Sequence, residues 1–294
     1  MSHVASLRQV RRRIRSVENT KKITRAMEMV AAAKLRRFQD LLEAAHAYTE
    51  KLEEMANRLL GELPPGYHHP FLEKPDSAAS SEKIALVIFT SDTGLCGTYN
   101  SEVESGAKSW IRENPARKIR FVFVGKHGAG AFHGKEGEAP ALFSDLRVGR
   151  VDEILEGLKK SLETAFLNSE VGEVWAGYTR MESLSRYHPL QQRILPIPSK
   201  AVEKKEGGSF LIEPGPKQVL DRLIPILFET RLRFILYHAL LTEQIARMSA
   251  MRQATQNAED MIDELTLLRN KARQASITKE IIEVVSGSRA LRRG

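Results

Sequence analysis

The stretch VENTKKITRAMEMVAAAKLRR, Val17–Arg37, decides how the chain begins to fold. It contains no Gly or Pro and carries six Lys and Arg residues against two Glu residues. Ile23, Met27 and Val30 recur at intervals of three and four, which places them on one face of an α-helix. The stretch therefore predicts a basic amphipathic helix that needs an apolar partner on one side and an acidic partner on another.

The same helical pattern extends outward from this stretch, from about Val4 to Leu60. No Pro or Gly occurs before Gly61, and such a helix would span roughly 85 Å at about 1.5 Å per residue. The segment GELPPGYHHP, Gly61–Pro70, ends the pattern with helix-breaking residues. We therefore expect an N-terminal helix over residues 1–60 and a linker over residues 61–81.

A second long helix is predicted from about Lys217 to Val285, roughly 100 Å in length. Pro225 is expected to kink its first turns or to delay its start, and Gly287 is a candidate for its end. Apolar and small residues recur in it near heptad spacing: Leu236, Leu240, Ala250, Ala254, Met261, Leu265, Leu268, Ala272 and Ala275.

The residues between the two helices have a different pattern. Lys83–Phe89 and Lys118–Gly125 are short runs of apolar, β-branched and aromatic residues, which are typical of buried strands. Glu173–Met181 and Gln191–Pro198 predict two further strands, antiparallel to each other, and Val151–Leu167 predicts an amphipathic helix. The alternation of strands and helices predicts a small α/β domain over residues 82–210.

Two long helices with apolar stripes can bury those stripes against each other. We therefore expect an α/β protein with a long antiparallel coiled coil. In this fold the N- and C-terminal long helices, residues 1–60 and 211–294, are paired, and a small Rossmann-like α/β domain is inserted between them. A slender rod of this kind suits reach into a confined space or the transmission of force over a distance.

The positive charge of the chain is confined to the first helix. Residues 1–40 hold 11 Lys and Arg against 3 Asp and Glu, a net charge of +8 that equals the excess of the whole chain. A localised positive charge indicates a localised negative partner: nucleic acid, an anionic lipid surface or an acidic protein surface. Residues 1–37 contain no aromatic residue, so the pattern favours the acidic protein surface over nucleic acid.

Composition limits the class of protein further. Cys96 is the one cysteine among 294 residues, so no internal disulfide is expected, which fits a reducing compartment. No run of about 18 apolar residues predicts a membrane span, and the basic N-terminal segment lacks the apolar core of a signal peptide. The eight His residues show no metal-ligand spacing, so no metal site is predicted.

The glycine-rich stretch VGKHGAGAFHGKEG, Val124–Gly137, follows a predicted strand and invites a nucleotide-binding interpretation. A P-loop would require Gly where the chain has Ala129 and Ser or Thr where it has Glu136. The glycines from Gly125 run as G-x-x-G-x-G, which is not the dinucleotide pattern. We expect an ordinary turn and no cofactor.

The stretch TSDTGLCGTYN, Thr90–Asn100, also follows a strand. Cys96 would act as a nucleophile only if a cation or a helix N-terminus lowered its pKa, and no His lies nearby in the sequence. We expect a strand-to-helix turn in which Gly94 and Gly97 supply backbone freedom and Asp92 acts as a cap. No catalytic, cofactor-binding or metal-binding residue is predicted.

Three stretches carry a family resemblance. They are TKKITRAMEMVAAAK (Thr20–Lys34), SDTGLCGTYN (Ser91–Asn100) and ARMSAMRQATQNAEDMIDELTLLRNKARQASITKEIIEVVSG (Ala246–Gly287). Together they closely resemble the gamma subunits of the F-type (F1Fo) ATP synthases, of the bacterial type. The likeness covers essentially the whole chain in order and spacing. The chain departs from the family at Thr93, where Arg is usual, and at Ser288, Pro225 and the basic tail.

The resemblance implies a central rotor shaft. Such a shaft couples proton (or sodium) flow through the c ring to ATP synthesis or hydrolysis on the alpha3beta3 ring by rotation. It implies a non-catalytic subunit without a cofactor, with the alpha and beta subunits, the epsilon subunit and the c ring as partners. Nucleic acid is not implied, and the membrane is approached only through the Fo sector. The expected place is peripheral, on the cytoplasmic face of the bacterial inner membrane.

The resemblance also assigns residues to partners, and the basic helix would face acidic loops at the lower rim of the beta subunits. The residues implied in contact with the catalytic beta subunits are Lys22, Arg25, Met27, Arg273, Gln274, Thr278 and Glu280. The residues implied in the foot region near the c ring are Phe210, Leu211, Ile212 and Glu213.

Two other classes are weighed against this one. A basic coiled-coil nucleic-acid-binding or scaffold protein would show DNA binding with a steep salt dependence. A small nucleotide-dependent enzyme carried on helical arms would show ATPase activity as an isolated chain, and the failed P-loop pattern argues against it.

Overall fold

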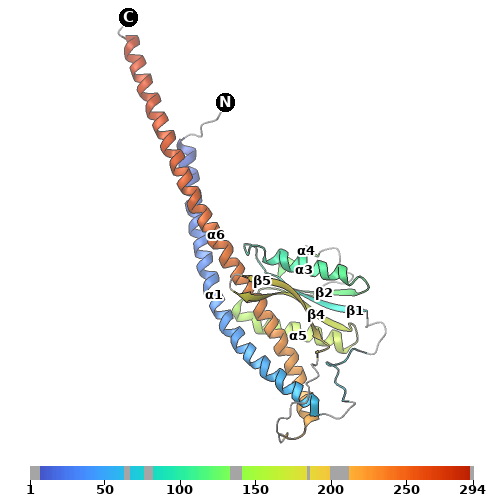
Figure 1. Cartoon of the computed structure of the whole chain (residues 1–294). Helices are drawn as coiled ribbons and strands as arrows, with labels where there is room; N and C mark the ends of the chain where they lie inside the picture. Colours follow the sequence, from blue (N-terminus) through green and yellow to red (C-terminus); the bar gives the residue numbers. More distant parts are fainter. Residues whose placement is uncertain are drawn as a thin grey trace. The chain divides into compact units, whose positions relative to one another are not determined.

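A computed structural model describes residues 7–62, 67–75, 82–132, 141–183, 186–198 and 212–291 of the chain. Two long helices, α1 (Leu7–Glu62) and α6 (Pro216–Leu291), flank a five-stranded sheet in the sequence (Figure 1). The chain forms two compact units. One unit combines Met1–Ala31 with Met248–Gly294, and the other is Ala32–Arg247.

The long C-terminal helix begins where the sequence predicts, but it ends later than predicted. Helix α6 begins at Pro216 and contains Pro225, so this proline does not delay its start. Proline removes one hydrogen-bond donor but has a φ angle suited to a helix, and Ile224 and Leu227 beside it are buried. The prediction that Gly287 ends the helix was also wrong, because α6 continues to Leu291. A glycine weakens a helix by only about 1 kcal/mol, so it need not end one.

In the first unit the two long helices are paired in antiparallel fashion. Val10 and Ile14 of α1 are buried along the pair, as the apolar pattern predicts. The prediction was wrong for Ile23 and Val30, which are 60% and 56% exposed, because the buried face passes through Thr24 and Ala31 instead. Residue numbers rise along α1 as those of their partners on α6 fall, which confirms the antiparallel coiled coil. The contacts that show this order are Lys21–Glu259 at 2.8 Å, Thr24–Thr255 at 2.8 Å and Glu28–Arg252 at 2.9 Å.

In the second unit α6 lies in the core. Every residue from Ile235 to Arg247 is buried. On one side the later part of α1 covers it, where His46 packs against Phe234 with ring centroids 5.6 Å apart. On the other side the sheet domain covers it, where the Thr242 hydroxyl donates to the carbonyl of Thr179 at 3.4 Å. A helix segment that is buried all round must be contacted on every side.

The sheet has the strand order β3-β2-β1-β4-β5. Strands β1 to β4 are parallel, and β4 and β5 form an antiparallel pair. The central strand β1 is buried from Ile84 to Phe89, which explains its unbroken apolar run. The strands are β1 (Lys83–Phe89), β2 (Lys118–Val124), β3 (Ala141–Phe143), β4 (Glu173–Ser183) and β5 (Arg186–Leu195).

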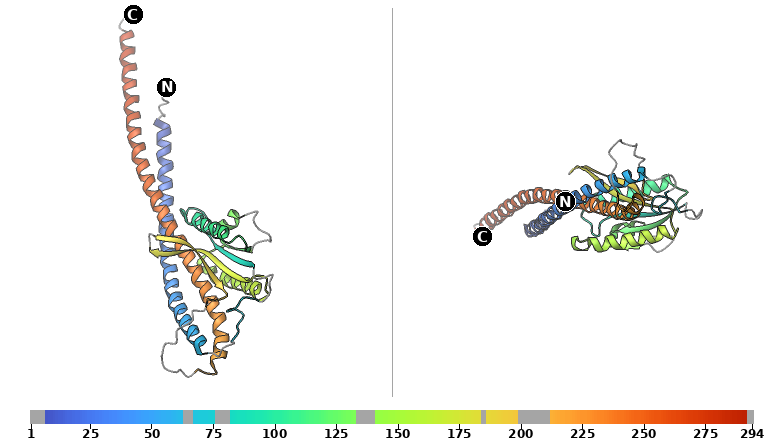
Figure 2. Two further views of the ribbon diagram at one scale, coloured as in Figure 1. Left: turned by 45° about the vertical axis from the view of Figure 1, so that its right-hand side comes forward. Right: turned by 90° about the horizontal axis from the view of Figure 1, so that it is seen from below.

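Helices cover both faces of this sheet. Helices α3 (Tyr99–Glu113) and α4 (Lys126–Ala131) lie on one face, and α5 (Val151–Leu167) lies on the other, after the short 3-10 turn η1 (Val148–Arg150) (Figures 1 and 2). This strand order with helices on both faces is that of doubly wound folds. The predicted Rossmann-like α/β domain is therefore confirmed.

The strand predictions differ from the structure at the sheet edges. The predicted strand over Gln191–Pro198 begins earlier, at Arg186, and ends at Leu195. Pro189 obscured its start, and a proline is tolerated there because β5 is an edge strand. The other edge strand, β3, was not predicted because three residues carry no periodic signal.

A buried carboxylate fastens the linker to the sheet. Glu173, at the start of β4, is 2% exposed. It accepts hydrogen bonds from Arg117 at 2.9 Å and from the indole of Trp175 at 2.8 Å, and it pairs with Lys74 of the segment 67–75. Burial by itself would raise the pKa of this carboxyl, but Lys74, Trp175 and Arg117 outweigh burial and lower it.

We expect Glu173→Gln to lower the free energy of unfolding by about 2 kcal/mol. The amide can still accept from Trp175, but both ion pairs lose their carboxylate. Urea unfolding followed by tryptophan fluorescence measures the change. The matched control is Glu113→Gln at the exposed end of α3, which should stay within about 0.5 kcal/mol. Equal effects of the two variants would show that Glu173 is not a structural anchor.

Candidate functional site

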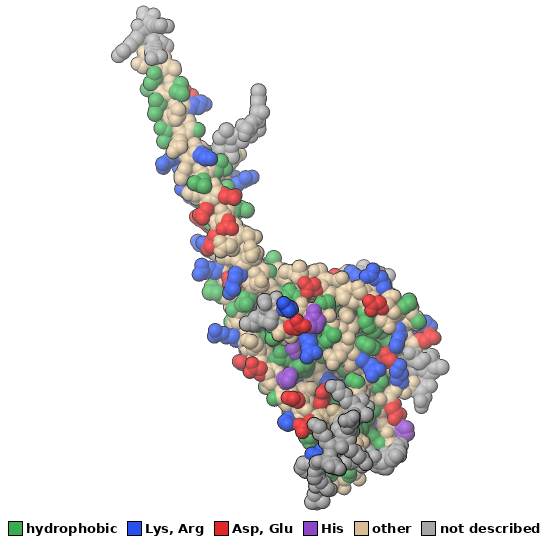
Figure 3. Space-filling view, viewed as in Figure 1, with side chains coloured by type: hydrophobic (Ala, Val, Ile, Leu, Met, Phe, Trp, Pro, Cys, Tyr) green, Lys and Arg blue, Asp and Glu red, His purple; other side chains and the backbone are tan. Residues whose placement is uncertain are grey.

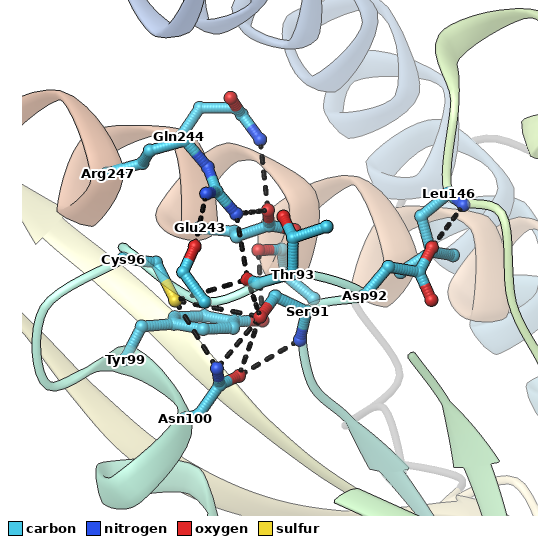
Figure 4. A network of polar contacts seen from close by, with 12 residues as sticks. Ser91, Asp92, Thr93, Cys96, Tyr99, Asn100, Leu146, Glu243, Gln244 and Arg247 are labelled. Carbon is cyan, nitrogen blue, oxygen red and sulfur yellow. Dashed lines mark hydrogen bonds and ion pairs between the residues drawn. The ribbon is translucent and has the colours of Figure 1, made fainter. Parts of the chain in front are cut away.

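The candidate site lies at the carboxyl end of β1, between β1 and β4. In doubly wound sheets the strand order reverses at this point, and ligands bind in the crevice that results. Two parts of the second unit meet here: the loop that follows β1 and the buried part of α6 (Figure 4).

The loop after β1 is held in one shape by its own side chains. The Ser91 amide donates to Asn100 Oδ1 at 3.0 Å, and the Ser91 hydroxyl donates to the carbonyl of Thr93 at 2.7 Å. Leu95 and Gly97 both have positive φ angles, of 65° and 58°. The predicted strand-to-helix turn is confirmed. Gly97 supplies the backbone freedom expected of it, since only glycine adopts such a φ without strain.

The cap predicted at Asp92 is present on a different helix. Its carboxylate accepts from the amide of Lys126 at 3.2 Å and from that of Leu146 at 2.7 Å. Lys126 is the first residue of α4, so Asp92 caps the N-terminus of a helix that follows another strand. Gly125, just before α4, has φ 95°, and a Cβ there would lie 2.1 Å from the carbonyl oxygen of Thr90. The glycine is required because the two loops approach so closely.

Arg247 of α6 enters this loop. Its guanidinium donates to the carbonyl of Gly94 at 2.5 Å and to that of Thr93 at 3.2 Å. It also pairs with Glu243, one turn earlier on the helix, at 2.6 Å. Both side chains are nearly inaccessible to solvent, and burial raises the pKa of the Glu243 carboxyl while Arg247 opposes the rise. The crevice that receives a ligand in related folds therefore receives a side chain of the chain's own helix.

A further contact attaches the domain to the same helix, in addition to that of Thr242 with Thr179. The hydroxyl of Tyr99, the first residue of α3, donates to the carbonyl of Ala239 at 3.2 Å. Tyr99 is completely buried, which raises the pKa of its phenol well above the usual value. With Thr242 and Arg247, these anchors are spread over about two turns of α6. Attachment at several heights along a helix resists both rotation and sliding, so the arrangement is a mechanical joint.

The described residues offer little for catalysis at this place. Cys96 is 2% exposed, and the Asn100 amide nitrogen lies 3.3 Å from its sulfur. Nucleophilic chemistry needs an accessible thiolate, and this thiol is buried. Within the described ranges no group of three His, Cys, Asp or Glu side chains could hold a metal ion. No helix of those ranges is long and apolar enough to cross a membrane.

The residues predicted to contact beta subunits all lie on the two-helix unit, in two separate groups. Lys22 and Arg25 are exposed on α1, and Met27 is half-exposed. The register of the helix pair places Arg273 of α6 opposite the start of α1. The second group begins at Arg273 and therefore lies roughly 25 Å from the first group along the axis of the helix pair. That second group consists of Arg273, Gln274, Thr278 and Glu280, all exposed on α6.

The residues predicted for the foot are partly visible. Ile212 is half-buried and Glu213 is exposed, just before α6 begins. Phe210 and Leu211 lie outside the described residues.

Sequence reasoning did not single out the joint residues Tyr99, Glu243 and Arg247. One signal was present. Glu243 and Arg247 are spaced by four within a stretch of α6 that is otherwise mostly apolar. A charged pair with i,i+4 spacing inside such a stretch indicates a buried ion pair rather than a solvated face.

The fold and the joint define a class of coiled-coil protein in which a doubly wound domain is mounted on the helices. The chain belongs to the ATP synthase family, whose family model matches residues 6–291. It is 40% identical to the ATP synthase gamma chain of Moorella thermoacetica, over 98% of this chain and all of that one. It is 36% identical to the ATP synthase gamma chain of Dechloromonas aromatica, over 97% of this chain and 99% of that one.

Solved structures share the fold. One is the structure of the Euglena gracilis mitochondrial ATP synthase that comprises OSCP, F1 and the c-ring in rotational state 3. A chain of it matches with a TM-score of 0.66 at 15% identity, over 98% of this chain and 95% of that one. A chain of the central stalk and c-ring structure from Tetrahymena thermophila mitochondrial ATP synthase matches with a TM-score of 0.56 at 22% identity. That match covers 79% of this chain and 99% of the other. The nucleic-acid-binding and scaffold alternatives find no support in these comparisons.

The joint gives a prediction about stability. Arg247→Met should lower the free energy of unfolding by about 3 kcal/mol, because it leaves Glu243 buried without its cation. The double variant Glu243→Gln with Arg247→Met should recover part of that loss. Urea unfolding with fluorescence detection measures both. Lys51→Met is the control, since it breaks an exposed pair with Glu54 in the same unit and should leave the free energy of unfolding nearly unchanged. A similar loss of unfolding free energy in Arg247→Met and Lys51→Met would contradict the assignment of Arg247 to a buried joint.

A buried histidine lies beside the joint on α6. His238 is 7% exposed and packs edge-on against Phe234, with ring centroids 4.5 Å apart. Within the described part of the chain its Nδ1 has no hydrogen-bond partner. Burial, with smaller contributions from Arg180 and His46, lowers the pKa of His238 to about 4. The imidazole is therefore neutral at pH 7.

This histidine predicts acid sensitivity. Between pH 6.5 and about 4 the unfolded chain binds a proton at His238 that the folded chain does not bind. The free energy of unfolding should therefore fall across this window as pH decreases, by up to about 3 kcal/mol. His238→Leu should remove this part of the slope, whereas His188→Leu, at a half-exposed position on β5, should not. The measurement is the free energy of unfolding at several pH values. Identical slopes against pH in the unsubstituted chain, His238→Leu and His188→Leu would refute the assignment.

Proposed function

We propose that this chain is the central rotor shaft, the gamma subunit, of an F1Fo ATP synthase. In this role it couples proton (or sodium) flow through the c ring to ATP synthesis or hydrolysis on the alpha3beta3 ring, and it holds no catalytic residue itself. The observation that carries the proposal is the end of α6, where apolar side chains are exposed to solvent. The similarity to an ATP synthase gamma chain over 98% of this chain supports it.

The end of α6 supports insertion into a protein cavity. Every residue from Arg273 to Ser288 is exposed, and Figure 3 shows apolar side chains along this part of the helix. Past Arg273 the helix continues beyond the first described residue of α1 for roughly 27 Å. Contiguous exposed apolar surface indicates a partner. The large apolar residues exposed here are Ile277, Ile281, Ile282, Val284 and Val285. An apolar collar formed by the ring of alpha and beta subunits would cover them.

The basic side chains support the contact with the lower rim of the ring. Lys22 and Arg25 project from α1 into solvent, and the cations of the first turns do so as well: Arg8, Arg11, Arg12, Arg13 and Arg15. Complementary potential aligns surfaces without a tight contact at any one residue. Such a contact suits a shaft that must pass three equivalent partners in turn, with acidic loops of the beta subunits as the other surface.

The joint supports the transmission of torque. In a rotor, the domain that joins the epsilon subunit and the c ring must turn with the helices. Tyr99, Thr242 and Arg247 fix the α/β domain to α6 through buried hydrogen bonds. The foot near the c ring would include Ile212 and Glu213. The subunit would be peripheral, on the cytoplasmic face of the bacterial inner membrane, reaching the membrane only through the Fo sector.

The test is observation of rotation. The chain is assembled with alpha and beta subunits, the ring is fixed to a surface, and a bead is attached to the α/β domain. Cys96 is 2% exposed and unsuitable for the attachment, so the bead is linked through Glu113→Cys at the exposed end of α3. Added ATP should drive steps of about one third of a turn in one direction, since three equivalent sites act in sequence.

Two results would overturn the proposal. Failure to assemble with alpha and beta subunits would remove the partner assignment. ATP turnover with a stationary bead would make the helices a scaffold. A second rotation assay uses a chain that also carries Arg247→Met. Because this variant loosens the joint, it should reduce the torque on the bead while ATP turnover continues.

A further inference from the structure

A cavity lies on the outer side of the α/β domain, away from the joint. Helix α4, which follows β2, has only six residues and packs at the carboxyl end of that strand, where the Gly128 amide donates to the Thr90 hydroxyl at 2.8 Å. Among the described residues, α3 is the helix that lies beside the first half of β2, with Ile119 and Phe121. The result is a cavity of about 800 Å³ between α3 and β2. Sites for small molecules in proteins have this size, roughly 300–1,000 Å³.

The inner wall of the cavity is apolar and aromatic. Phe121 and Phe132 form the floor of the cavity, with ring centroids 5.3 Å apart, but Phe132 is 0% and Phe121 6% exposed, so a ligand reaches only the edge of Phe121. Ile111 and Ile119 are half-buried beside them. Aromatic rings favour a flat apolar partner in offset or edge-on contact. The wall therefore suits an aromatic body rather than a strongly hydrated one.

The rim of the cavity carries more positive than negative charge. Lys108, Arg112 and Arg117 line it, with Glu104 as the acid among its lining residues. Arg117 is committed to the buried carboxylate of Glu173. Lys108 lies 3.9 Å from Glu104, at the limit of an ion pair, and 5.3 Å from the centre of the Phe132 ring.

Arg112 is the cation best placed for a ligand. Within the described residues its guanidinium donates to the Ser109 hydroxyl at 3.0 Å and pairs with no carboxylate. A guanidinium presents parallel donors that match the two oxygens of a carboxylate. Lys108, held only loosely by Glu104, supplies a second cation on the same helix face, four residues earlier.

We propose that this cavity binds a small aromatic carboxylate, with its ring against Ile111, Ile119 and the accessible edge of Phe121, and its acid group on Arg112 and Lys108. The site is separate from the joint, and it does not depend on the rotor assignment. Occupation would brace α3 against β2 and so stiffen the domain without touching α6.

The probe is 2-naphthoate, added to the full-length chain and measured by isothermal titration calorimetry. We expect a dissociation constant below about 1 mM. The neutral amide, 2-naphthamide, has the same ring without the charge and should bind at least about tenfold more weakly. Absence of naphthoate binding, or equal binding of the two compounds, would overturn the proposal.

Variants locate the site. Arg112→Gln should weaken naphthoate binding by about tenfold, and Glu104→Gln should strengthen it by releasing Lys108. Lys160→Gln removes an exposed cation from α5 on the opposite face of the sheet and should leave binding unchanged. Circular dichroism confirms that each variant is folded. Unchanged affinity in Arg112→Gln, or an equal loss in Lys160→Gln, would show that binding occurs elsewhere and refute the assignment.

Discussion

The complete burial of α6 between Ile235 and Arg247 is the constraint on which the second unit depends. A charged pair placed there loses its water, and the loss is tolerable only if every donor and acceptor finds a partner. Glu243 and the carbonyls of Thr93 and Gly94 supply those partners for Arg247. The loop after β1 must then keep one shape, which explains why Ser91 and its neighbours are so heavily hydrogen-bonded to one another.

The α/β domain illustrates how one fold carries different functions. Its strand order is that of nucleotide-binding sheets, and its switch point is formed in the usual way. The carbonyls that line the switch point bind Arg247 from the chain itself. The glycines nearby serve close packing rather than phosphate binding: Gly125 allows the turn before α4 to approach Thr90. In this chain, the crevice is where helix α6 is attached to the domain.

One part of the two-helix unit is stabilised by contacts between its own helices, and the end of α6 is not. Between Lys21 and Arg252 the helices satisfy each other, and the buried hydroxyl pair of Thr24 and Thr255 fixes their register because an unpaired hydroxyl there would be costly. Past Arg273 the apolar side chains of α6 remain in solvent. Among the described residues no part of the chain covers these side chains, which fits a shaft whose tip contacts another subunit.

The sequence by itself determined the long helices, their antiparallel pairing and the main strands. Periodicity and strand composition are local properties, and Lys83–Phe89 and Val151–Leu167 have the predicted bounds. It also indicated the absence of a P-loop pattern and the family. Only the tertiary structure decided that Asp92 caps α4, that Arg247 enters the loop after β1, and that β3 pairs at the edge. These contacts join residues 19 to 154 positions apart, so no local pattern encodes them. Their energy comes from burial, which exists only once the chain has folded.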